Sequence, residues 1–125
     1  MIPDMTGKTI EMIRFNYSLA IWTGDNWQLD LAGVTHITLE GGSRVEIDTT
    51  LCQDELTDAV RPLLGQAIIG TVVSSSGDLT ITLSHAQVEV QAGDDHEAWQ
   101  IYGPSGEIIV CMPGGELAIW GPRAT

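Results

Sequence analysis

The chain has 125 residues, of which 17 are acidic and 5 are basic, so its formal net charge is −12. This length accommodates a single domain, residues 1–125, with one core. Hydrophobic residues make up 43% and charged residues 18%, a balance typical of globular rather than disordered proteins. Because so acidic a surface repels phosphate backbones and anionic lipid headgroups, we expect neither nucleic-acid nor membrane partners.

The N-terminal residues do not have the pattern of a secretory signal. Pro3 and Asp4 interrupt the stretch where a continuous apolar run is needed. The two cysteines, Cys52 and Cys111, are too few for a disulfide framework or a zinc site. We therefore expect a cytoplasmic protein with buried thiols and with no metal or cofactor.

Apolar residues at every second position predict strands in the N-terminal half. Residues 18–22 and 27–31 alternate in this way around the polar turn 23–26, which predicts a hairpin. Residues 35–39 and 44–48 form a second predicted hairpin around the glycine-containing turn 40–43.

The pattern changes near residue 53 and predicts one short helix over 53–61. Leu56, Val60 and Leu63 recur at spacings of three and four, so we expect them to face the core. Acids lie toward the start of this stretch, where they favour the helix dipole. Pro62 cannot donate a backbone hydrogen bond, so a regular helix should end or kink near Arg61.

Strand composition resumes after the helix and continues to the C-terminus. The predicted strands are 66–73, 78–83, 87–91, 98–102, 107–112 and 116–120, separated by glycine-, proline- and serine-rich turns. The fold class is therefore mainly β, at the margin of α+β. Antiparallel meanders would form a sandwich or a rolled, barrel-like sheet.

The two sides of the helix resemble each other. Residues 7–48 align with residues 65–112, with the helix 53–61 between them and one extra C-terminal strand. This match indicates an internal duplication. Alternation alone also produces matches between any two amphipathic meanders, so both interpretations stay open.

The candidate interaction residues are acidic and lie in two clusters along the sequence. They could dock a basic protein, although charged runs are more often simply solvated. Asp94, His96 and Glu97 also offer metal or acid–base chemistry, but adjacent side chains on a loop point in different directions. The residues are Glu46, Asp48, Asp54, Glu55, Asp58, Asp94, Asp95 and Glu97.

Other chemistry-bearing residues favour structural roles. Ser84 and His85 are neighbours in one turn, so together with Asp78 they are not expected to form a catalytic triad. The Gly-Pro-Ser-Gly and Pro-Gly-Gly sequences precede strands rather than helices, which excludes a phosphate loop. Trp99 and Trp120 are expected to be core residues, because an indole buries a large apolar area.

The C-terminal residues resemble a family of small, acidic, mostly actinobacterial proteins catalogued only as a domain of unknown function. The resemblance is carried by His96-Glu97-Ala98-Trp99, by Gly103, and by the closing Pro-Gly-Gly-Glu-Leu-Ala-Ile-Trp of residues 113–120. It implies no activity. By analogy alone, some small acidic proteins of this general kind are immunity proteins that neutralise secreted toxins.

Three functions remain to be compared. The one we expect is a non-catalytic interaction module, of the immunity type or otherwise, that binds a basic protein through its acidic surface. The alternative is a small-ligand carrier whose interior is lined by Trp22, Trp27 or Trp99. A hydrolytic enzyme using carboxylates ranks last. An edge-strand homodimer fits an open sheet, but no feature of the sequence selects it.

Overall fold

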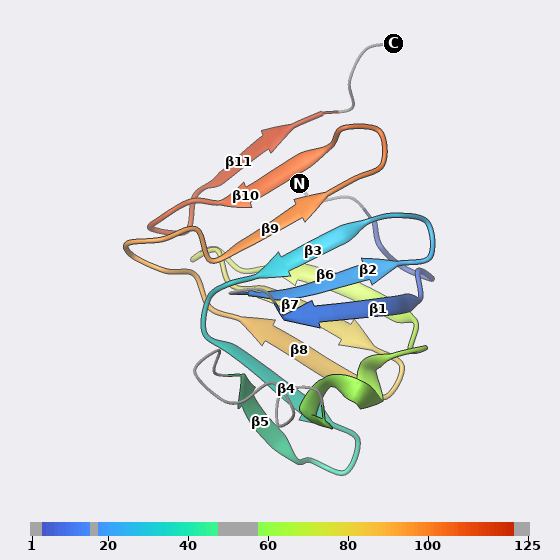
Figure 1. The fold of residues 1–125 in the computed structure, drawn as a ribbon. Coiled ribbons are helices and arrows are strands. Elements are labelled where there is room, and N and C mark those ends of the chain that lie inside the picture. The colour runs from blue at the N-terminus through green and yellow to red at the C-terminus, as the bar shows by residue number, and fades with distance from the viewer. Residues whose placement is uncertain (1–3, 16–17, 48–57, 122–125) are drawn as a thin grey trace.

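The computed structural model of the chain describes residues 4–15, 18–47 and 58–121, and its fold is mainly β (Figure 1). The first five strands are β1 (Ile10–Phe15), β2 (Leu19–Thr23), β3 (Gln28–Leu31), β4 (Thr35–Leu39) and β5 (Arg44–Ile47). The later strands are β6 (Ile68–Val73), β7 (Leu79–Leu83), β8 (Ala86–Val90), β9 (Trp99–Tyr102), β10 (Ile108–Cys111) and β11 (Leu117–Trp120). The predicted strands are confirmed, with ends that differ by one or two residues.

The strands form two antiparallel sheets that enclose a single core. One sheet has the order β1-β2-β3-β9-β10-β11, and the other has the order β5-β4-β8-β7-β6. In Figure 1, β9 to β11 lie at the top of the molecule and β4 and β5 at the bottom. Fully buried side chains such as Leu29 and Ile101 of the first sheet belong to the same core cluster as Ile81 and Val88 of the second. Burying a side chain of this size stabilises the fold by about 1.5 to 3 kcal/mol.

The order of the strands in the sequence suggests that each sheet is one meander of successive strands. The structure differs, because each sheet combines strands from both halves of the chain. The N-terminal β1–β3 meander pairs with β9, and the later β6–β8 meander pairs with β4. The two crossing connections lie against each other. Ala32 N–H donates to the Ala98 carbonyl at 2.8 Å, and Gln91 N–H donates to the Val34 carbonyl at 3.0 Å. Each sheet is thus completed by strands from the other half of the chain.

The two halves meet in a symmetric seam where β1 and β6 begin. Gly7 N–H donates to the Ile68 carbonyl at 2.8 Å, and Gly65 N–H donates to the Ile10 carbonyl at 2.8 Å. The strand register shifts immediately after Ile10 in β1 and after Ile68 in β6. This correspondence is what a duplicated chain would produce, and an origin by duplication remains a prediction.

The predicted helix lies partly outside the described residues. Residues 58–60 form a helical turn that continues as the 3₁₀ turn η1 (Arg61–Leu63). The helix changes type where Pro62 removes a backbone donor, as the sequence predicts. Val60 and Leu63 are buried in the core, whereas Leu56 is outside the described residues. Over 4–15, 18–47 and 58–121, no helix has the length and apolar character needed to cross a membrane.

Five of the hairpin loops share one design. In each, the first N–H donates to the carbonyl of the fifth residue, and the fourth N–H donates back to the first carbonyl. This is the pattern of a three-residue loop that ends in a G1 bulge, whose last loop residue needs a positive φ. The loops are 23–27, 39–43, 74–78, 103–107 and 112–116. The fourth residues are Asn26, Gly42, Gly77, Gly106 and Gly115, with φ between 69° and 97°.

Substitutions at two of these glycines would distinguish the cost of backbone strain from the cost of a steric clash. A Cβ on Gly42 would have no heavy atom within 4 Å, whereas a Cβ on Gly115 would lie 2.1 Å from the Ser76 carbonyl oxygen. Gly42→Ala should therefore lower the free energy of unfolding by about 1 to 2 kcal/mol through left-handed strain alone. Gly115→Ala should cost clearly more, since the neighbouring loop must also move. Urea unfolding of both variants measures the difference, and equal losses would contradict this contact.

Candidate functional site

The predicted acidic residues that the structure describes do not all line one site. Asp48, Asp54 and Glu55 are outside the described residues. Asp58 lies 3.5 Å from Arg61 in an exposed ion pair one helical turn away. A pair this exposed contributes little to stability, and it leaves Asp58 on the surface beside a cation.

Glu46 and His96 line one hollow of about 280 Å³, between β5 and the connection that joins β3 to β4. Glu46 also lies 3.2 Å from His36 Nε2. Asp95 lies 2.8 Å from His96 Nδ1, and this hydrogen bond lowers the pKa of the Asp95 carboxyl. We call this site the acidic hollow. It brings Glu46 of the first acidic cluster beside His96, which lies within the second, and the sequence alone did not predict this.

Glu97 belongs to a different hollow from its neighbour His96. It lines a groove formed with residues of β9, β10 and β11, where Gln100 Nε2 donates to its Oε1 at 3.0 Å. Asp94 is exposed. Asp94, His96 and Glu97 therefore do not converge as an acid–base site requires. No group of three or more His, Cys, Asp or Glu residues arranged to hold a metal ion occurs in the described part of the chain.

The outer face of the six-stranded sheet carries a row of large apolar and aromatic side chains. These residues alternate with the buried ones and lie opposite each other across successive strands. The row, which we call the aromatic row, is Met12, Trp22, Gln28, Tyr102, Ile108 and Trp120. Trp120 is 54% exposed and Met12 is 38% exposed, so the row is open to solvent at both ends.

The five-stranded sheet provides an internal control for this row. Strands β6, β7, β8, β4 and β5 occupy the places in their sheet that β1, β2, β3, β9 and β10 occupy in the other. The equivalent residues are Gly70, Thr82, Gln87, Thr38 and Arg44. Only the glutamine is shared, and the others are small or polar. The fold therefore does not require aromatic side chains in this row.

The C-terminal part of the aromatic row forms a groove of about 510 Å³, which we call the aromatic groove. None of the described residues that line it is a lysine or an arginine. Its aromatic members are Tyr102 and Trp120, and its aliphatic members are Ile108 and Val110. The other lining residues are Glu97, Gln100, Gly106 and Gly121.

A chain of hydrogen bonds holds the carboxylate in the aromatic groove. The Tyr102 hydroxyl donates to Gln100 Oε1, and the other end of the same amide donates to Glu97. Burial raises the pKa of Tyr102, and the negative charges of Asp30 and Glu97 raise it further. The electrostatic potential in the groove is therefore negative, which favours a cation beside the aromatic rings.

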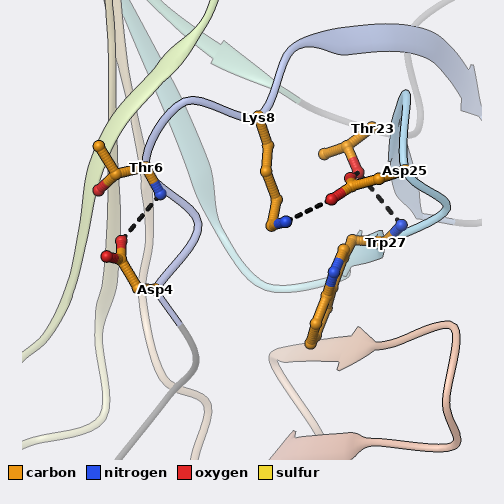
Figure 2. Close-up of polar contacts among 6 residues, drawn as sticks. All are labelled: Asp4, Thr6, Lys8, Thr23, Asp25 and Trp27. Carbon is orange, nitrogen blue, oxygen red and sulfur yellow. Dashed lines mark hydrogen bonds and ion pairs between the residues drawn. The ribbon is translucent and has the colours of Figure 1, made fainter.

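The single lysine is part of the structural seam rather than of either hollow. Lys8 Nζ pairs with the Asp25 carboxylate and lies 5.6 Å from the centre of the Trp27 ring. Figure 2 shows that these residues also include Thr23, whose hydroxyl donates to Asp25 at 2.6 Å and accepts the Trp27 N–H at 3.1 Å. This arrangement fixes the β2–β3 loop against the segment before β1.

The Lys8 pair predicts a defined acid sensitivity. Hydrogen bonds from Lys8 and Thr23 lower the pKa of Asp25 below its usual 3.8. A lowered pKa in the folded state stabilises the protein above the unfolded-state pKa, and this stability is lost as pH falls through the folded value. Asp25→Asn should therefore flatten the loss of stability on acidification below pH 4, measured by urea unfolding at a series of pH values. Lys8→Met should reduce the same step, and an unchanged acid step in both variants would contradict the assignment.

Among the described residues, the tryptophans do not share one environment, since Trp22 and Trp120 lie in the aromatic row whereas Trp27 and Trp99 are buried. Trp99 is fully buried and its Nε1 donates to the Gly77 carbonyl at 2.9 Å, and Trp27 is also buried. The prediction that Trp99 is a core residue is thus confirmed. The same prediction for Trp120 is wrong, because this residue falls on the outer face. The alternation in the sequence places Trp120 and Ile119 on opposite faces of the strand. Ile119 is on the inner face, where it pairs with the buried Ile109, so Trp120 is on the outer face.

Cys111 does not provide a reactive thiol. It is fully buried, and its Sγ lies 3.5 Å from the Gly77 carbonyl oxygen. Burial raises the pKa of the Cys111 thiol, and the charge of Asp78 adds to this. A raised pKa disfavours the thiolate that nucleophilic or redox chemistry needs.

Comparison with known proteins identifies a family but no characterised relative. No curated protein and no solved structure matches the chain. A family model described as a family of unknown function (DUF6188) matches residues 1–121, a span that includes both hollows and all the strands. The chain therefore belongs to DUF6188.

Proposed function

We propose that this protein is a non-catalytic interaction module that binds a basic protein partner through the aromatic groove. The observation that carries the proposal is the combination of the exposed Trp120 and the partly buried Tyr102 with the oriented Glu97 carboxylate. The equivalent row of the other sheet has small or polar residues instead. An exposed aromatic surface that the fold does not need is typical of a binding site.

The groove has the chemistry to hold a lysine or arginine side chain. The faces of Tyr102 and Trp120 attract a cation, and each such contact contributes about 0.5 to 2 kcal/mol, depending on how far it is desolvated. Glu97 supplies the opposite charge. Ile108 and Val110 can cover the aliphatic stem of the bound side chain, which long cationic residues keep in contact with apolar surface.

The charge on the rest of the surface speeds the approach of a basic partner but does not determine which partner binds. A net charge of −12 attracts basic proteins from a distance, and added salt weakens that attraction. Glu46 in the acidic hollow and the exposed Asp95 beside His96 add to this field. An immunity-type role, in which the basic partner is a secreted toxin, is the form of the proposal suggested by analogy with other small acidic proteins, and the family resemblance itself implies no activity.

The finer features of the family assignment belong to the same proposal. We expect relatives to share the closing Pro-Gly-Gly-x-x-Ala-x-Trp of residues 113–120, because this stretch forms the last hairpin loop and supplies Trp120. An actinobacterial source is likewise proposed. A cytoplasmic location suits the buried Cys111 thiol, since that compartment keeps thiols reduced.

A small organic cation is the alternative ligand for the same groove. The volume of about 510 Å³ lies within the range of small-molecule pockets. This alternative differs from the carrier considered in the sequence analysis, whose ligand would lie inside the fold beside Trp22, Trp27 or Trp99. Titration with N-acetyl-arginine amide and with tetramethylammonium separates the two functions, because saturable binding of either free cation favours the carrier.

A cationic peptide tests the interaction module directly. Hexa-arginine should bind the wild-type protein by isothermal titration calorimetry, and high salt should weaken the binding. Trp120→Ala should lower the affinity by about 2- to 30-fold, because it removes one desolvated cation–π contact. Glu97→Gln should lower it as well, through loss of the charge in the groove.

Matched controls distinguish the groove from general acidity. Glu46→Gln makes the same charge change as Glu97→Gln, but in the acidic hollow. Thr38→Ala changes the five-stranded sheet at the place equivalent to Tyr102. Both variants should bind hexa-arginine like the wild type. If Glu46→Gln weakens binding and Trp120→Ala does not, the acidic hollow is the site and the proposal for the groove is wrong.

A further inference from the structure

Among the described residues, β11 is an end strand, and no other strand pairs with its second hydrogen-bonding edge. It pairs with β10 on one side and stands last in its sheet. Met112 N–H donates to the Glu116 carbonyl at 2.7 Å, which sets the alternation of bonded pairs along this hairpin. Ala118 and Trp120 therefore direct their backbone groups to β10. Leu117 and Ile119 direct theirs away from it, toward the open edge.

This edge lacks the features that usually prevent strand pairing. Its sequence, Leu-Ala-Ile-Trp, contains no charged residue and no proline. The end strand of the other sheet, β5, contains Arg44 and Glu46. The remaining end strands, β1 and β6, meet each other in the seam, where the Ile69 carbonyl also accepts the Thr6 hydroxyl at 3.2 Å.

Both faces of β11 are incompletely covered. Trp120 on the outer face is 54% exposed, and Ile119 on the inner face is 48% exposed. Ile119 lies opposite Ile109, which is only 2% exposed, so the core ends abruptly between these two residues. One more strand beside β11 would cover Ile119 on one face and extend the aromatic groove on the other.

We infer that β11 accepts a strand from the basic partner, in which basic and apolar residues alternate. This inference rests on the proposed function and specifies how the partner binds. Side chains of the added strand that lie beside Trp120 point to the outer face, toward the aromatic groove and Glu97. Those beside Ile119 point to the inner face and need to be apolar. Backbone hydrogen bonds to Leu117 and Ile119 supply the rest of the affinity.

Charge selects this occupant over a second copy of the chain. A β11 strand from a second copy would bring only apolar side chains and no cation for Glu97. Two molecules of charge −12 also repel each other. A strand that carries lysine or arginine on its outer face complements both the groove and the net charge.

Two peptides of identical composition provide the test. One alternates lysine and valine, and the other places the same residues in two blocks, so that only the first matches both faces of β11. The alternating peptide should bind about tenfold more tightly, because it alone forms the edge hydrogen bonds. It should also slow amide hydrogen exchange at Leu117 and Ile119. N-methylation of alternate backbone amides on its bonding edge should remove this advantage, and the wild-type protein is used throughout.

A variant of the protein provides an independent test of strand addition. Ile119→Pro removes the donor at the open edge, a position where an end strand tolerates proline. The variant should bind both peptides with the lower affinity of the block peptide, while the contribution of Trp120 to binding remains.

The outcomes separate the two proposals. If both peptides bind equally and exchange at Leu117 and Ile119 is unchanged, strand addition is wrong and the interaction module stands. If neither peptide binds, the proposed function fails with it. If Leu117 and Ile119 are protected without peptide and light scattering shows a dimer, the second copy is the occupant and the inference is overturned.

Discussion

The contact between the Trp99 indole and the Gly77 carbonyl positions the part of the molecule on which function depends. Trp99 opens β9, and its Nε1 donates to a carbonyl in the loop between β6 and β7. Cys111 at the end of β10 approaches the same oxygen. The β10–β11 loop then contacts that loop directly, since Gly115 leaves no room for a side chain against Ser76. Three successive strands are thus fixed to one turn of the opposite sheet, and with them the aromatic groove.

The inner and outer faces of the six-stranded sheet are subject to different constraints. The inner face is fixed by the shared core, in which Leu29 and Ile101 have no freedom to become polar without loss of stability. The outer face is free of this requirement, as the polar residues at the equivalent positions of the other sheet demonstrate. The difference between the two outer faces, rather than any motif, distinguishes the candidate site. Glu97, which accepts a hydrogen bond from Gln100, lines the groove formed by the C-terminal part of the aromatic row.

Local patterns predicted the local structure well and the pairing of distant strands poorly. Alternation located the strands and most of the hairpin loops, because both depend on near neighbours. The exchange of strands between halves was not predictable, because alternation does not determine that β3 pairs with β9. The acidic hollow was missed for the same reason, as Glu46 and His96 are far apart in the sequence. For Trp120 the two sequence signals conflict: residue type favours the core, whereas alternation with Ile119 favours the outer face, where the residue is found.

The exchange of strands between the two halves also has a consequence for synthesis of the protein. The N-terminal half emerges from the ribosome with β1–β3 and β4–β5 separated from the strands that complete their sheets. The five-stranded sheet has all its strands once β6 to β8 have been translated, whereas the six-stranded sheet is incomplete until β9 to β11 have been translated. The nascent chain therefore carries unprotected hydrophobic surface until near the end of translation. Contacts this distant in sequence also form slowly. The architecture therefore makes a molecular chaperone most useful during the interval before the last hairpin docks.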